Sequence, residues 1–239
     1  MKSLYIITGT GKGLGKALAE VVLSEGAMVL GISRTKSIEH DNYQHITLDL
    51  NNVEKVSGFA LPADVNEYEK VVLVNNAGIL GDINHVGKLN NDTIAQTFTV
   101  NTIAPAILMN NFMRQYKGFK GEKIVLNISS GAGKVAIDGW SAYCASKAAV
   151  DMFTQVAAKE IAIDGLDFKV FALSPGIIDT NMQEQIRQAD KEGFSEVERF
   201  KEYKANNELQ SAEETAQKIY WFLQNTAQFN DVIVSVRDF

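Results

Sequence analysis

Short apolar runs that are rich in β-branched residues alternate along this chain with longer segments of helical periodicity. The apolar runs occupy 4–8, 28–33, 45–48, 71–75, 123–129, 168–173 and 232–236. Uninterrupted apolar runs of this length are typical of parallel strands that are buried on both faces. Because crossovers between parallel strands are right-handed, the pattern predicts an α/β fold, a doubly wound parallel sheet of about seven strands with helices on both faces.

The segments between these runs have the spacing of amphipathic helices. Helices are expected at 14–25, 92–116, 140–163 and 212–225. The last of them opens with Ser211 and Glu214, which have the spacing of a capping box. The segment 51–69 has room for only a short helix, because Gly58 and Pro62 interrupt it.

The chain has three prolines and no Ser/Gly-rich linker, so we expect a single domain over 1–239. The segment 183–207 is polar and charged. Two interpretations of it stay open, a lid over the crevice at the carboxyl ends of the strands and a solvated pair of surface helices.

Charge and cysteine content restrict the partners and the cell compartment. There are 23 Lys and Arg against 29 Asp and Glu, a formal net charge of −6, which argues against nucleic acid and anionic membranes as partners. Cys144 is the single cysteine, and no segment reaches the roughly 18 apolar residues of a membrane helix. His40, His45 and His85 lack metal-ligand spacing and are expected at the surface or at a strand edge. We expect a cytoplasmic protein.

Four glycines follow the first apolar run and open the first helical segment. Gly9 permits a tight turn, Gly13 permits close contact with a phosphate, and Gly15 permits close packing of helix on strand. The amides and the positive dipole end of the helix then face the phosphate. In this strand, turn and helix context the loop predicts a dinucleotide pyrophosphate site, with a simple glycine-rich loop as the alternative.

The end of the second apolar run indicates which dinucleotide is bound. An NAD site would place an acid there to bind the ribose 2′-hydroxyl, but this chain has Ser33 and Arg34, with Lys36 following and Lys12 in the glycine loop. Cations suit a 2′-phosphate, so the residues predict NADP, although Lys36 fits a solvated surface charge equally well. Asp49, after the third run, has two open roles, binding the adenine amino group or capping the next helix.

Tyr143 and Lys147 lie four residues apart, on one face of a predicted helix. A phenol that exchanges protons near pH 7 needs its pKa lowered by roughly 3, and a neighbouring ammonium supplies part of that. Ser130 precedes Tyr143 by 13 residues, and its hydroxyl could polarise a carbonyl oxygen; Ser129 is its rival. Asn101 is an asparagine within a predicted helix, which is costly to bury unless its amide is paired.

Together these motifs resemble the short-chain dehydrogenase/reductase family over essentially the whole chain. The motifs in family order are the glycine loop, Asp49, 75–78, Asn101, Ser130, Tyr143 with Lys147, and 174–180. The runs 129–134, 139–144 and 179–183 resemble the benzil reductase and sepiapterin reductase branch of NADPH-dependent carbonyl reductases. The resemblance implies a single NADP-binding Rossmann domain.

The resemblance also implies a role for each matching residue. Tyr143 would donate a proton to the carbonyl oxygen, Ser130 would hydrogen-bond that oxygen, and Lys147 would bind the nicotinamide ribose and lower the pKa of Tyr143. Asn101 would support a relay water, and no metal is implied. The implied cofactor contacts are Gly9, Thr10, Lys12, Gly13, Leu14, Gly15, Ser33, Arg34, Asp49, Asn76, Ala77, Gly78, Tyr143, Lys147, Pro175, Gly176, Ile178 and Thr180.

An apolar pocket beside Tyr143 is expected to bind an aryl or alkyl ketone or a 1,2-diketone. Its expected residues are Ser130, Trp140, Ile177 and Met182, with Leu80 and Ile186. Near the C-terminus, where sepiapterin reductases present an acid, this chain has Ser235 with Asp238 nearby, which favours an apolar dicarbonyl. The alternatives are reduction of sepiapterin or of a 3-oxoacyl thioester, and an NADP-sensing protein without turnover. The resemblance further implies a homodimer or homotetramer.

Overall fold

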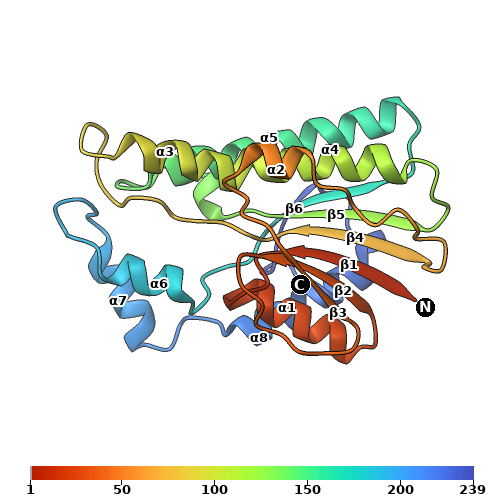
Figure 1. Ribbon diagram of the computed structural model, residues 1–239. Helices are drawn as coiled ribbons and strands as arrows, with labels where there is room; N and C mark the ends of the chain where they lie inside the picture. Colours follow the sequence, from red (N-terminus) through yellow and green to blue (C-terminus); the bar gives the residue numbers. More distant parts are fainter. Residues whose placement is uncertain (1) are drawn as a thin grey trace.

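The computed structural model describes residues 2–239 as one wholly parallel sheet of seven strands between two layers of helices (Figure 1). The strand order is β3-β2-β1-β4-β5-β6-β7. The strands are β1 (Ser3–Thr8), β2 (Met28–Ser33), β3 (Tyr43–Thr47), β4 (Lys70–Asn75), β5 (Glu122–Ile128), β6 (Lys169–Ser174) and β7 (Ile233–Ser235). All seven predicted strands are confirmed, although the third begins at Tyr43, before its apolar run. The strand order reverses between β1 and β4, which opens a crevice at their carboxyl ends.

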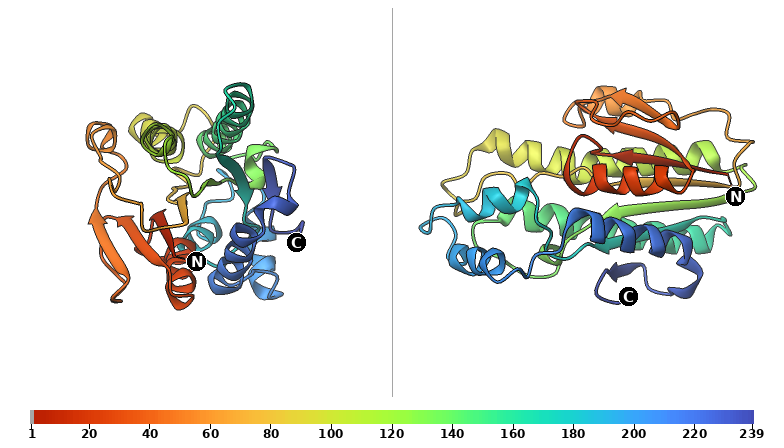
Figure 2. Two further views of the ribbon diagram at one scale, coloured as in Figure 1. Left: turned by 90° about the vertical axis from the view of Figure 1, so that its right-hand side faces the viewer. Right: turned by 90° about the horizontal axis from the view of Figure 1, so that it is seen from below.

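Helices cover both faces of the sheet, as predicted. The helices are α1 (Gly13–Ser24), α2 (Val53–Ser57), α3 (Asn91–Phe98), α4 (Ala104–Tyr116), α5 (Ser141–Ile163), α6 (Asn181–Arg187), α7 (Val197–Ala205) and α8 (Ala212–Gln224). Figures 1 and 2 show α2, α4 and α5 on one face and α1 and α8 on the other. Within residues 2–239, no helix combines the length and the apolar character that crossing a membrane requires.

Each face of the sheet has its own apolar core. Leu18 of α1 and Phe222 of α8 are fully buried on one face, and Leu108 and Phe112 of α4 are fully buried on the other. Burying a side chain of this size contributes about 2 kcal/mol to folding. The two cores pack the helices on the sheet, and this packing holds the strand ends that border the crevice in place.

The predicted helix at 92–116 is confirmed as one helical stretch, and it contains a π-helical turn that was not predicted. Between α3 and α4 the chain makes a π-helical turn, Thr99–Ile103, with Asn101 at its centre. The Asn101 amide donates to the Ile79 carbonyl at 2.8 Å and to the Ser146 hydroxyl at 3.0 Å, and its Oδ1 accepts from the Ile79 N–H at 2.8 Å. The buried amide is therefore fully paired, and the wider turn directs it to the loop after β4.

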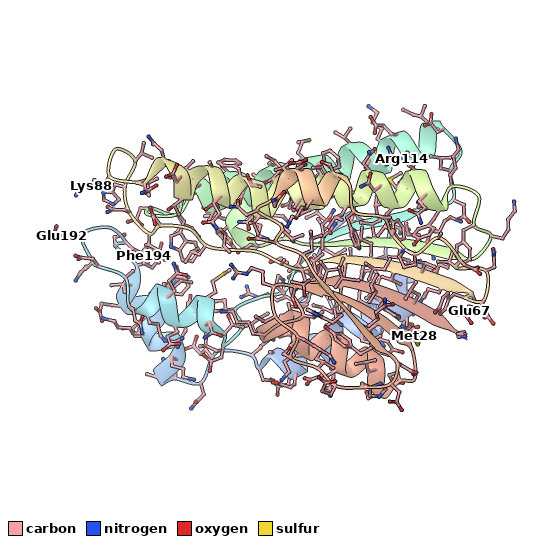
Figure 3. All side chains as sticks on the ribbon, in the orientation of Figure 1. Met28, Glu67, Lys88, Arg114, Glu192 and Phe194 are labelled. Atoms are coloured by element: carbon pink, nitrogen blue, oxygen red, sulfur yellow. The ribbon has the colours of Figure 1, made fainter. Side chains whose placement is uncertain are left out.

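The segment 183–207 contains a helix pair, the second half of α6 and all of α7, beyond the carboxyl ends of the strands (Figure 1). The segment is a surface helix pair whose inner face is apolar, since Phe194, Val197 and Phe200 are buried. The Phe194 ring stacks on Trp140 with centroids 5.3 Å apart. Figure 3 shows Glu192 at the tip of the connecting loop and Phe194 on its inner side. Lid motion of this segment stays a prediction.

A polar latch holds the loop between α6 and α7 to the rest of the molecule. The two carboxylate oxygens of Asp138 accept from Ser195, one from its backbone N–H at 2.8 Å and one from its hydroxyl at 3.0 Å. The Ser195 backbone hydrogen bond is the main cause that lowers the pKa of Asp138. The Gln185 amide adds a bond to the Gly81 carbonyl at 3.0 Å. Ser195 thus holds the loop, and Gln185 holds the helix α6 that precedes it.

We predict that Asp138→Ala releases this loop, because both Ser195 donors lose their acceptor. Limited proteolysis should cut the variant within 188–196 about five times faster than the wild type, in line with an exposed hydrogen-bond pair worth about 1 kcal/mol. Asp164→Ala, a change at an exposed aspartate after α5, is the matched control. Equal cutting rates for Asp138→Ala and the wild type would show that the latch does not hold the loop.

Candidate active site

The glycine loop has the backbone that the sequence predicts. Gly9 and Gly13 have φ of +79° and +58°, in the left-handed region that favours glycine. A Cβ at Gly15 would lie 2.5 Å from the Gly9 carbonyl oxygen, so α1 packs on β1 more closely than any side chain permits. The position of a Cβ at Gly13 lies 3.6 Å from the Thr180 methyl group. Thr180 therefore faces the loop across the crevice, as expected.

The end of β4 is tied directly to the end of β1. The Thr8 hydroxyl accepts from the N–H groups of Asn76 and Ala77, each at 3.0 Å. The Asn76 side chain donates to the Thr8 carbonyl at 2.9 Å. These bonds bring the predicted residues Asn76 and Ala77 beside the glycine loop.

A cavity of about 810 Å³ opens at the N-terminus of α1. Gly11, Gly13 and Thr180 line it together with charged side chains of both signs. The cations are Lys12, Lys16, Arg187 and Lys204, and the acids are Glu20, Asp179, Glu184 and Glu213. Lys16 is ion-paired with Glu20, and Arg187 and Lys204 are ion-paired with Asp179. Free helix amides together with cations fit a pyrophosphate. Sequence reasoning missed Arg187, whose buried Nη1 lies 3.6 Å from Asp179 Oδ1 and has no hydrogen-bond partner. The sequence offered no usable signal for Arg187, because the seven-residue helix α6 is too short for its periodicity to show which side chains face the cavity.

At the end of β2, Ser33 is buried while Arg34 and Lys12 are exposed. Lys36 forms an ion pair with Glu39 at 2.6 Å, which favours the surface-charge interpretation of Lys36. No acid is present at the end of this strand, so Arg34 and Lys12 are the cations available to a 2′-phosphate.

Asp49 does not cap the helix after β3. Its Oδ1 accepts from the N–H of Asn51 at 3.0 Å, and Asn52 is the residue that caps α2. The capping role is therefore wrong, and an adenine contact stays a prediction for this exposed side chain.

Ser130, Tyr143 and Lys147 come together at the carboxyl end of β5. Tyr143 and Lys147 lie on α5, with the Lys147 ammonium 5.8 Å from the centre of the Tyr143 ring and hydrogen-bonded to the Ile128 carbonyl at 2.7 Å. Ser130 lies beside Tyr143, and its side chain lowers the pKa of that phenol. Its rival Ser129 lies beside Asp151, and lowers the pKa of that carboxyl. This placement favours Ser130 over Ser129, and its contact with a carbonyl oxygen stays a prediction.

Gly78 leaves space between Lys147 and Asn101. A Cβ there would lie 3.4 Å from Asn101 Oδ1 and 3.5 Å from the Lys147 ammonium. A group bound at this point can contact both side chains. Within residues 2–239, no three His, Cys, Asp or Glu side chains lie close enough together to hold a metal ion.

Burial dominates the protonation of the two key groups. It raises the pKa of Tyr143 to about 12, against the opposing hydrogen bond with Ser130. It lowers the pKa of Lys147 to about 8, against the opposing charge of Asp151. The expected lowering of the Tyr143 pKa by Lys147 is not seen, because only burial, Ser130 and Cys144 shift it. At neutral pH the phenol therefore holds its proton and the lysine is largely charged.

An apolar cluster borders Tyr143. Leu80, Trp140 and Ile186 are buried in it, and Met182 packs against it. Their contact with a substrate stays a prediction. Trp140 meets Tyr143 edge to face with ring centroids 5.8 Å apart, and its buried indole N–H has no partner. Ile177 lies outside this cluster.

Sequence reasoning missed two members of the cluster. Phe194 and Phe200 complete the aromatic wall around Trp140. They are aromatic residues within the otherwise charged segment 183–207, and an aromatic side chain in such a segment indicates a buried contact. The Ile177 carbonyl accepts from the Gln210 N–H at 3.0 Å, and a substrate contact of its side chain stays a prediction.

Comparison with known proteins agrees with this site. The short chain dehydrogenase family matches residues 3–191. Benzil reductases ((S)-benzoin forming) are similar, that of Bacillus subtilis at 35% identity over 99% of both chains, and that of Bacillus cereus at 39% over 90% of this chain and 91% of the relative. Rat sepiapterin reductase is 29% identical over 93% of this chain and 91% of its own. A solved short-chain dehydrogenase/reductase from Saccharomyces cerevisiae superposes with a TM-score of 0.84 at 25% identity, covering 99% of this chain and 96% of that one. The protein therefore belongs to the short-chain dehydrogenase/reductase family of oxidoreductases, in the branch of the benzil and sepiapterin reductases.

Proposed function

We propose that this protein is an NADPH-dependent carbonyl reductase whose substrates are ketones or 1,2-diketones of the aromatic, benzil-like kind. The observation that carries the proposal is the meeting of Ser130, Tyr143 and Lys147 beside the aromatic cluster of Trp140. The glycine loop lies at the same edge of the sheet. The similarity to two benzil reductases supports the same substrate class.

In this proposal, bound NADPH supplies a hydride to the carbonyl carbon. Tyr143 donates its phenolic proton to the carbonyl oxygen, so that the product is an alcohol. Ser130 donates a hydrogen bond to that oxygen and stabilises the negative charge that develops on it. Lys147 stabilises the phenolate that Tyr143 leaves, and Asn101 holds the Ile79 backbone in place at the rim of the site.

The residues at the end of β2 support NADP over NAD. An NAD site needs a carboxylate for the 2′-hydroxyl, and Ser33 followed by Arg34 offers none. The exposed guanidinium of Arg34 and the ammonium of Lys12 suit a phosphate dianion.

The aromatic wall and the net charge separate this proposal from its rivals. Trp140, Phe194 and Phe200 favour an aryl substrate, and a net charge of −6 disfavours an acidic acyl carrier. Asp238, near the position where a sepiapterin reductase presents an acid, already accepts from the Ser235 N–H at 2.8 Å. An NADP sensor would need no proton donor, and Tyr143 is one.

The expected homodimer or homotetramer and the cytoplasmic location stay predictions. Met152, Phe153 and Val156 of α5 are exposed large apolar side chains, and they form a surface on which a second subunit could pack.

The direct test follows NADPH consumption with benzil and with 1-phenyl-1,2-propanedione, and repeats it with NADH. The wild type should turn over with NADPH and more slowly with NADH. Tyr143→Phe should lose about 100-fold or more of kcat, because the proton donor is gone, while its NADPH affinity stays close to that of the wild type. Tyr220→Phe, a change on α8 far from the crevice, should be as active as the wild type.

Two outcomes of this test would contradict the proposal. Tight NADPH binding by the wild type, without turnover of any diketone or ketone, would favour the sensor. Full activity of Tyr143→Phe would remove Tyr143 as the proton donor.

The pH profile of reduction should follow Lys147. The phenol of Tyr143 remains protonated well above neutrality, because burial raises its pKa to about 12. The ammonium of Lys147 is present below pH 8 and is lost as the pH rises through about 8. The kcat for reduction should therefore be flat near neutral pH and fall above about pH 8, and Lys147→Arg, which keeps its charge, should be less active but lack this fall. A kcat that rises through pH 8 would contradict the assignment.

A further inference from the structure

The edge strand β3 sends two side chains toward the cofactor end of the sheet. Tyr43 and His45 lie two residues apart and so share one face of the sheet, where their rings stack with centroids 6.4 Å apart. The Tyr43 hydroxyl is 2.9 Å from the Thr10 hydroxyl in the glycine loop. The ring reaches Thr10 by crossing β2 at Gly31, where any Cβ would overlap the Tyr43 hydroxyl.

His45, like Tyr43, contacts a residue at the cofactor end of the sheet, and that residue is Ser33. Its Nε2 lies 3.0 Å from the Ser33 hydroxyl oxygen. Ser33 ends β2 beside the glycine loop, since a Cβ at Gly11 would lie 3.7 Å from the Ser33 Cβ. Ser33 is therefore at the point where the proposed 2′-phosphate is expected.

The hydrogen bonds of Ser33 define the protonation of His45. A serine hydroxyl carries one proton, and Ser33 donates it to the Thr35 carbonyl at 2.8 Å. The Ser33 oxygen must then accept from His45, so the imidazole carries a proton on Nε2. If Ser33 instead donated its proton to His45, the Ser33 oxygen would present only lone pairs to a phosphate, and these would repel the phosphate oxygens.

We propose that His45 is a positioning residue that sets the preference for NADPH over NADH, an inference that rests on the proposed use of NADPH. By donating Nε2–H to Ser33, His45 prevents Ser33 from donating inward. The Ser33 proton can then turn from the Thr35 carbonyl, which lies on an exposed residue, to a 2′-phosphate oxygen. A cofactor with a 2′-hydroxyl is not a dianion and depends far less on this donor, so the effect is confined to phosphorylated ribose.

The test measures binding of four nucleotides by calorimetry, so that it does not depend on turnover. His45→Leu should bind NADPH and 2′,5′-ADP about tenfold more weakly, because the Ser33 oxygen loses the donor that fixes its orientation with the proton toward the phosphate. Its affinity for NADH and 5′-AMP should stay within about twofold of the wild type. His45→Gln, whose amide can donate from a similar position, should recover most of the loss.

Gln44→Leu is the matched control, since Gln44 is the exposed neighbour on β3 and its side chain points to the opposite face. This variant should bind all four nucleotides as the wild type does. A double variant, Ser33→Ala with His45→Leu, should bind 2′,5′-ADP no more weakly than Ser33→Ala alone, because His45 acts through Ser33.

Three results would overturn the inference. The first is an equal loss for all four nucleotides in His45→Leu, which is what a purely structural role predicts. The second is unchanged binding of 2′,5′-ADP, and the third is additive losses in the double variant. A wrong proposal of NADPH use can be told apart from a wrong role of His45. It would show in the wild type as equal affinity for 2′,5′-ADP and 5′-AMP, and the inference about His45 would then fall too.

Discussion

The close packing of α1 against the carboxyl ends of β1 and β4 is the constraint on which the rest of the site depends. Gly15 brings α1 onto the Gly9 backbone, and the Thr8 hydroxyl holds the first two residues after β4. Two strands and one helix N-terminus thus meet at one point. The amides of that terminus and the loop after β4 then face the same crevice, and this fixes where a dinucleotide can lie.

The catalytic side of the crevice depends on burial in a similar way. Tyr143 and Lys147 are almost inaccessible to solvent, and burial moves the pKa of each group toward its neutral form. A buried phenol with a raised pKa stays protonated at neutral pH. The charge of a buried ammonium interacts more strongly with its neighbours, because the dielectric constant around it is low. The paired amide of Asn101 and the bare backbone of Gly78 keep the space beside them open.

Much of this could be predicted from sequence, because apolar runs and glycine spacing are local signals. The seven strands, the glycine loop and the grouping of Ser130, Tyr143 and Lys147 follow from such patterns. The π-helical turn at Asn101 did not, since it arises from pairing with Ile79, a contact distant in sequence. The aromatic wall of Phe194 and Phe200 was hidden in a charged segment whose burial is decided by its packing on Trp140.

The sequence also did not predict which side chains contact one another. Two roles of Lys36 stayed open from the sequence, and its ion pair with Glu39 favours the surface charge. His45 carried no motif at all, and its contact with Ser33 depends on the pairing of β3 with β2. In both cases the deciding partner is set by tertiary structure and not by spacing along the chain.

The central claim is that this crevice passes a hydride from NADPH to a carbonyl carbon while Tyr143 supplies the proton. The most direct measurement is a single reaction with NADPH that carries two deuterium atoms at nicotinamide C4, with benzil as substrate and mass spectrometry of the product. The account predicts benzoin with one deuterium on the carbinol carbon and an exchangeable proton on its oxygen. Benzoin without deuterium, or no reduced product at all, would contradict it.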